Sequence, residues 1–150
     1  MKKIILTLCF TALFGFNPSI GSYFIIDPLI EKIESFVKEW WDVPYKYGGT
    51  TKRGIDCSVF TQRFYKEIFD KKIPRTARSQ FYAMDKVDKD SIQTGDLVFF
   101  SSKISPSGWH VGIYLWDGIF VHAANRKEDI KMSNLSEENY QKNYKGARRI

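Results

Sequence analysis

The sequence is poor in cysteine and histidine. Its 150 residues include two cysteines, Cys9 and Cys57, and two histidines, His110 and His122. These residues form neither a CxxC nor an HExxH string, so the usual spacings of a zinc site are missing. The sequence also lacks repeats, low-complexity tracts and linkers, which predicts one domain without an attached binding module.

The apolar run near the start of the sequence is too short for a permanent membrane span. It covers residues 4–16, follows two lysines and falls short of the ~20 residues that a bilayer requires. Small residues occupy positions −3 and −1 of a cleavage site before Ser22. We therefore predict a signal peptide at residues 1–21 and a single domain at residues 22–150. The expected protein is exported, periplasmic or secreted, and associated with the cell wall.

The charge of the chain limits its partners. The formal net charge is +6 at pH 7, a modest positive value that suits an anionic matrix such as a cell wall. The basic residues are scattered, which argues against nucleic acid as a partner. Leu8 is too large to precede a lipidated cysteine, so Cys9 is not predicted to carry a lipid. We expect the mature protein to be a monomer.

Helical patterns in the first half of the chain give way to strand patterns in the second. Asp27 and Pro28 are typical of a helix start, and apolar residues then recur at spacings of three and four. Helices are expected at residues 28–41, 56–69 and 77–84, and strands at residues 97–100, 111–115, 119–124 and, as an edge strand, 146–150. Helices followed by an antiparallel sheet predict an α+β domain.

Cys57 is a candidate nucleophile because it lies in the first turn of a predicted helix. Free N–H groups and the positive end of the helix dipole favour a thiolate there. A nearby imidazolium would lower the thiol pKa further and make the sulfur nucleophilic at neutral pH. The alternative is that Cys57 is simply a small buried apolar residue.

His110 and His122 are twelve residues apart, across a predicted hairpin. A two-residue turn puts His122 opposite Ile113, on the face away from His110. A three-residue loop at residues 116–118 puts His122 opposite Gly112, so that both histidines share one face as diagonal neighbours. We predict the three-residue loop, because it lets one imidazole orient the other.

These three residues predict a division of labour. His110 takes the proton of Cys57 and later protonates a leaving amine, while His122 fixes the ring of His110 by a hydrogen bond. The competing use of a Cys-His-His set is a zinc site completed by water. We predict no metal and no other cofactor, because no spacing supports one.

Seven short strings carry a resemblance to a known family. They are, in order, PYKYGG, GIDCS, PRTARSQ, GDLVFF, WHVGIYL, FVHAA and GARRI. Over residues 41–150 the chain resembles the NlpC family of papain-like cell-wall endopeptidases. The resemblance implies a papain-like fold whose cysteine opens a helix packed on an antiparallel sheet. It also implies hydrolysis of amide bonds in the stem or cross-link peptides of peptidoglycan.

The resemblance assigns roles by position. Cys57 is the nucleophile, His110 the base and His122 the orienting residue. Tyr45 matches a tyrosine whose hydroxyl lies near the oxyanion, where it acts together with the Cys57 N–H. Asp56 and Ser58 match residues that hold a free amine of the substrate, and for Asp56 a helix cap is an equal alternative.

Other residues have two readings each. Arg75 and Arg78 suit the carboxylates of the stem peptide, and structural contacts to backbone carbonyls are the alternative for Arg75. Trp109 either lines the cleft or packs in the core. Val59 replaces the family's glycine after Asp-Cys-Ser and either crowds the substrate or only shifts the helix.

The sequence leaves the function open between three classes. The main prediction is an exported peptidase that cleaves either D-Glu–diamino acid or diaminopimelate–D-Ala bonds. The alternatives are an inactive domain that binds muropeptides or a protein partner, and an amidase or acyltransferase with another substrate.

Overall fold

The computed structural model describes residues 27–150, so the predicted signal peptide and its cleavage site lie outside the described residues. Helices dominate the first half and strands the second, as predicted. The elements are α1 (Pro28–Trp40), β1 (Thr50–Thr51), β2 (Gly54–Ile55), α2 (Cys57–Phe69), α3 (Ala77–Ala83), β3 (Asp85–Val87), a 3₁₀ turn (Lys89–Ser91), β4 (Leu97–Ser101), β5 (Trp109–Trp116), β6 (Ile119–Ala123), β7 (Ile130–Asn134), α4 (Glu138–Asn143) and β8 (Tyr144–Arg149).

The first helix begins as its sequence predicts. The Asp27 carboxylate accepts a hydrogen bond from the N–H of Leu29 at 2.8 Å, and Pro28 occupies the first turn. One face of α1 is buried, with Phe36 packed against Phe60 and Phe64 of α2 at ring-centroid distances of 5.3 and 5.4 Å. This aromatic contact holds α1 along α2.

Six strands form one antiparallel sheet in the order β3-β8-β4-β5-β6-β7. The α+β class is confirmed. The prediction that the last strand lies at an edge is wrong, because β8 pairs with both β3 and β4. The two edges are instead β3 and β7, which are short and mostly polar. Such strands protect an edge but have no continuous apolar pattern for sequence reasoning to detect.

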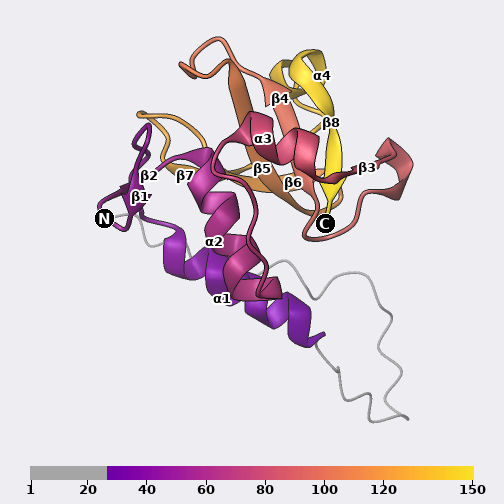
Figure 1. Ribbon diagram of the computed structural model, residues 1–150, viewed down its shortest axis with the longest axis horizontal. Helices are drawn as coiled ribbons and strands as arrows, with labels where there is room; N and C mark the ends of the chain where they lie inside the picture. Colours follow the sequence, from indigo (N-terminus) through magenta and orange to yellow (C-terminus); the bar gives the residue numbers. More distant parts are fainter. Residues whose placement is uncertain (1–26) are drawn as a thin grey trace, which may run out of the picture.

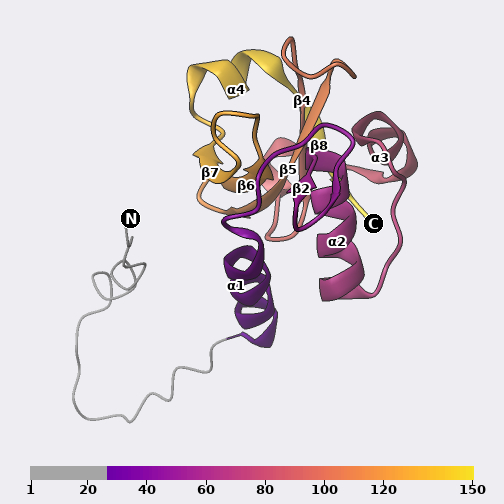
Figure 2. The same ribbon diagram turned by 90° about the vertical axis from the view of Figure 1, so that its left-hand side faces the viewer.

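Apolar side chains fill both faces of the sheet. One core lies between the sheet and helices α1 and α2, and a smaller one lies on the other face under Tyr140 of α4. Figure 2 shows α2 and α3 on one side of the sheet and α4 on the other, and Figure 1 shows α1 alongside α2. None of the helices within residues 27–150 is long and apolar enough to cross a membrane.

The turn between β5 and β6 differs from the prediction. Trp116 pairs with Ile119, and the two residues between them, Asp117 and Gly118, have positive φ angles of 48° and 78°. The predicted three-residue loop is therefore wrong. A two-residue turn of this kind matches the twist of a hairpin, and Asp-Gly is a favoured sequence for it.

A bulge in β5 restores the predicted register all the same. The pairing shifts between Tyr114 and Trp116, which leaves Leu115 as an extra residue. Ile113 therefore pairs with Val121. A Cβ atom added at Gly112 would lie 3.2 Å from Cβ of His122, so the predicted placement of His122 beside Gly112 is confirmed.

Candidate active site

Two buried histidines meet on one face of the sheet. Nε2 of His110, on β5, lies 2.7 Å from Nδ1 of His122, on β6. The ring centroids are 4.9 Å apart and the rings are inclined at 78°. His110 is 8 % exposed and His122 is 1 % exposed. This hydrogen bond leaves Nδ1 as the free ring nitrogen of His110.

Burial keeps both imidazoles neutral. It lowers the pKa of His110 to about 4. The pKa of His122 is also lowered well below its ordinary value, first by burial and then by the charges of His110 and Lys131. Each ring therefore carries one N–H group at neutral pH. One ring must donate in the bond between them and the other must accept.

Cys57 is the first residue of α2, and its side chain faces the beginning of β5. It is a free, buried cysteine. The backbone N–H groups of Val111, Ser58 and Cys57 itself lie close to the sulfur and favour its ionised form. Val111 directly follows His110 in β5.

The surroundings of Cys57 oppose the preformed thiolate that its helix position predicts. Burial of the sulfur, followed by the Asp56 carboxylate, raises the pKa of the Cys57 thiol to about 12. Desolvation penalises the anion more than the helix N-terminus stabilises it. Because the pKa of His110 is lowered at the same time, the pair rests as a neutral thiol and a neutral imidazole.

Tyr45 lies near the nucleophile candidate, at the entry to the loop before α2. Burial, then the charges of Cys57 and Asp56, raises the pKa of Tyr45 to about 12, so its hydroxyl stays protonated and able to donate. The N–H of Tyr45 donates to the Asp129 carboxylate at 2.9 Å. Asp129 thus ties this loop to the segment before β7, a contact that nothing in the sequence indicates.

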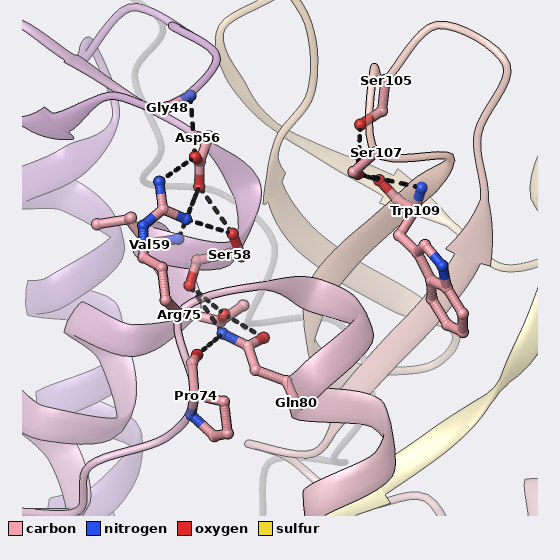
Figure 3. A network of polar contacts seen from close by, with 11 residues as sticks. Gly48, Asp56, Ser58, Val59, Pro74, Arg75, Gln80, Ser105, Ser107 and Trp109 are labelled. Atoms are coloured by element: carbon pink, nitrogen blue, oxygen red, sulfur yellow. Dashed lines mark hydrogen bonds and ion pairs between the residues drawn. The ribbon is translucent and has the colours of Figure 1, made fainter.

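Asp56 is the N-cap of α2, as one of its two predicted readings has it. Its buried carboxylate accepts hydrogen bonds from the N–H groups of Val59 and Gly48 and from the hydroxyl of Ser58. Arg75 donates to both carboxylate oxygens, the shorter distance being 2.7 Å, and to Ser58 Oγ at 2.9 Å (Figure 3). The structural reading of Arg75 is therefore observed, although its partner is a carboxylate rather than a backbone carbonyl.

Gln80 is a buried residue that sequence reasoning missed. Its amide donates to the carbonyls of Ser58 and Pro74, each at 2.9 Å (Figure 3). Its carbonyl oxygen accepts a hydrogen bond from the hydroxyl of Thr61 at 2.9 Å. Gln80 therefore fixes the first turn of α2 to the loop that carries Arg75. The sequence feature that could have indicated Gln80 is its position at the end of the string PRTARSQ.

The remaining candidates lie at the margin of the site. Trp109 packs against Phe81 and Tyr82 of α3, with ring-centroid distances of 5.2 and 6.1 Å. Arg78 is exposed on α3. Val59 is 3 % exposed and belongs to the main core, so its replacement of glycine affects helix packing.

The described residues were also compared with the zinc-site alternative. Within residues 27–150 no three His, Cys, Asp or Glu side chains are grouped so that they could hold a metal ion.

Comparison with known proteins identifies the family. The model of the NlpC/P60 family matches residues 42–149. The chain belongs to the NlpC/P60 family. The match covers nearly all of the described region after α1, and with it every candidate site residue.

Two proteins of Escherichia coli are similar to this chain over most of its length. The chain is 38 % identical over 122 residues to the probable endopeptidase NlpC of Escherichia coli K12, covering 81 % of this chain and 79 % of that protein. It is 39 % identical over 112 residues to the murein DD-endopeptidase MepS/murein LD-carboxypeptidase of the same organism, covering 75 % of this chain and 58 % of that protein.

A solved structure confirms the fold. An NlpC/P60 family protein from Bacillus cereus ATCC 10987 superimposes with a TM-score of 0.71 at 32 % identity, over 82 % of this chain and 40 % of that one. The helices followed by an antiparallel sheet are therefore the NlpC/P60 arrangement.

Proposed function

We propose that this NlpC/P60 domain is an exported cysteine endopeptidase that hydrolyses amide bonds in the peptides of peptidoglycan. Cys57 acts as nucleophile, His110 as base and His122 as orienting residue. The observation that carries the proposal is the buried 2.7 Å contact between the two histidines, with Cys57 at a helix N-terminus facing the same strand. Relatives named as murein endopeptidases support the choice of substrate.

The neutral resting pair dictates how the first step begins. Nδ1 of His110 accepts the proton of the Cys57 thiol as the sulfur attacks the amide carbon, because a free thiolate is disfavoured beforehand. This step requires the thiol and Nδ1 of His110 to lie within hydrogen-bond distance of each other. The carbonyl oxygen becomes an oxyanion, and the positive charge on His110 balances it.

The second half of the reaction returns the proton. The tetrahedral intermediate collapses, the C–N bond breaks, and His110 protonates the departing amine. A water molecule then loses a proton to His110 and attacks the thioester. The acid product leaves, and Cys57 regains its proton.

Two donors suit the oxyanion. The N–H of Cys57, in the first turn of α2, has no partner within the helix, and the Tyr45 hydroxyl is held protonated by its raised pKa. Both belong to the part of the chain that leads into α2, from residue 45 to residue 57.

Arg75 and its partners form the proposed substrate subsite. The oxygens of Asp56 already accept from Arg75, Ser58 and backbone N–H groups, so an incoming ammonium would have to share this carboxylate with Arg75. The side chain of Arg75 is 43 % exposed, which leaves N–H groups for a carboxylate of the stem peptide.

Digestion of purified peptidoglycan tests the proposal. The protein is incubated with diaminopimelate-containing walls beside a Cys57→Ala variant and a Trp116→Ala variant, whose altered side chain is exposed on the β5–β6 hairpin. We expect soluble fragments from the parent and from Trp116→Ala, and none from Cys57→Ala. The fragment masses distinguish cleavage within the stem from cleavage of the cross-link.

Contrary outcomes are equally clear. Release of the same fragments by Cys57→Ala would refute the nucleophile. Wall binding without release by the folded, reduced protein would favour the inactive binding domain instead. Export is tested separately, by sequencing the N-terminus of the protein recovered outside the cytoplasm, which we expect to begin at Ser22.

A further inference from the structure

The second ring nitrogen of His122 faces two hydroxyl groups. His122 Nε2 lies 3.2 Å from Oγ of Ser133, on β7, and 3.4 Å from the phenol oxygen of Tyr140, on α4. The two hydroxyl oxygens are 3.4 Å apart. Ser133 is 6 % exposed and His122 is 1 % exposed. A ring nitrogen this deeply buried needs a protein partner, and Ser133 is the nearer of the two.

Packing gives the His122 ring a defined orientation. The ring of Tyr140 meets it edge-on, with centroids 5.6 Å apart and an angle of 87°, and the Phe120 ring lies at 4.8 Å. A ring confined in this way cannot turn over to exchange its two nitrogens without moving its neighbours. The partners of each nitrogen are therefore fixed, and only the proton positions remain to be decided.

One hydrogen atom lies between the two imidazoles. Whether it is bonded to His110 or to His122 determines which nitrogen is protonated in each ring. If His110 donates, its Nδ1 keeps a lone pair, and the proton of His122 must be on Nε2. If His122 donates, the proton of His110 is on Nδ1, the only nitrogen left to meet a thiol. In that second arrangement His110 cannot act as a base, so the two tautomers differ in catalytic competence.

We propose that Ser133 is a positioning residue that selects the competent tautomer, by accepting a hydrogen bond from Nε2–H of His122. This inference rests on the proposed function, because it takes Nδ1 of His110 as the base. Ser133 Oγ has donor geometry toward the Tyr140 oxygen at 3.4 Å, and a serine hydroxyl that donates there presents its lone pairs to the ring. A proton placed on Nε2 of His122 leaves its Nδ1 as an acceptor for His110, 2.7 Å away.

Nitrogen NMR tests the inference directly, because the chain contains only two histidines. Labelling with ¹⁵N-histidine gives four imidazole nitrogen signals, all from this pair, and long-range ¹H–¹⁵N correlations report which nitrogen carries the proton. At neutral pH we expect both rings to be protonated on Nε2. A parent protein with His110 protonated on Nδ1 would overturn the inference.

Variants of Ser133 separate positioning from folding. Ser133→Ala leaves Tyr140 to donate to Nε2 of His122, so we expect a population of the Nδ1-protonated tautomers and a loss of about tenfold in kcat with little change in KM. Ser133→Thr keeps the hydroxyl, and Ser136→Ala removes an exposed one just after β7. Both should keep the parent's tautomers and rate.

The outcomes distinguish this inference from the proposed function. Unchanged tautomers and an unchanged kcat in Ser133→Ala would refute the role of Ser133. The NMR spectra require no substrate and therefore test the proton positions independently of the activity. If the rings are protonated on Nε2 but the protein does not digest the wall, the peptidase function is refuted and the proton positions are not.

Discussion

Acidification from pH 7 to pH 5 should destabilise this protein through its two histidines. Burial lowers the pKa of His110 from 6.5 to about 4, so the unfolded chain binds a proton in this range and the folded chain does not. Stability contributed by neutral His110 is complete above pH 6.5 and is lost as the pH falls toward 4. One pKa unit corresponds to about 1.4 kcal/mol, which gives a loss of about 2 kcal/mol at pH 5.

Two other groups modify this loss of stability. The pKa of His122 is lowered as well, so its contribution has the same sign as that of His110 and steepens the fall. Glu67 acts in the opposite direction, because partial burial and the charge of Glu39 raise its pKa.

Urea unfolding at a series of pH values measures the effect. The free energy of unfolding should fall between pH 7 and pH 5 with an unchanged m-value. A His110→Gln/His122→Gln variant removes every histidine from the chain and should show an almost flat profile. A flat profile for the parent protein, or an undiminished slope in the double variant, would show that these imidazoles are not held neutral by burial.

Three further perturbations have expected outcomes. A Cβ atom at Gly112 would lie 2.5 Å from a ring carbon of Phe120, so Gly112→Ala should lower the urea midpoint by the equivalent of about 1–3 kcal/mol, and an unchanged midpoint would contradict this packing. Arg149→Leu removes the charged partner of the buried Asp96 carboxylate and should lower the free energy of unfolding by about 1–3 kcal/mol. Adding Asp96→Asn to this variant should restore part of the loss in the same assay. Alkylation of Cys57 by iodoacetamide should be slow at pH 7 and still accelerate above pH 9, since burial raises its pKa to about 12; a plateau below pH 8 would disprove this.

Local patterns predict the central elements well because each is encoded by contiguous residues. The cap at Asp27, the start of α2 at Cys57 and the hairpin strands around residues 117–118 all depend on neighbours in the chain. The bulge at Leu115 is different, because it depends on the register between β5 and β6 as a whole. The sequence therefore predicts that the two histidines share one face of the sheet, but it does not predict the combination of turn and bulge that places them there.

The electrostatics of the site cannot be predicted from a helix position. The first turn of α2 favours a thiolate at Cys57, but the neighbours that bury the sulfur come from distant segments, and their effect is larger. The partners of His122 are equally distant, since Ser133 and Tyr140 come from β7 and α4 in a polar stretch without a clear pattern. Long-range contacts of this kind require the fold.

Buried polar contacts join the recognisable strings of this sequence in pairs. Asp56 of GIDCS meets Arg75 of PRTARSQ, and Asp96 of GDLVFF meets Arg149 of GARRI. The two histidines join WHVGIYL to FVHAA in the same way. A buried charge without its partner is costly, whereas replacing both partners costs less. A polar residue in one string is therefore stabilised only when the other string supplies its partner. For this reason several short strings in order indicate this fold and site more strongly than any one of them.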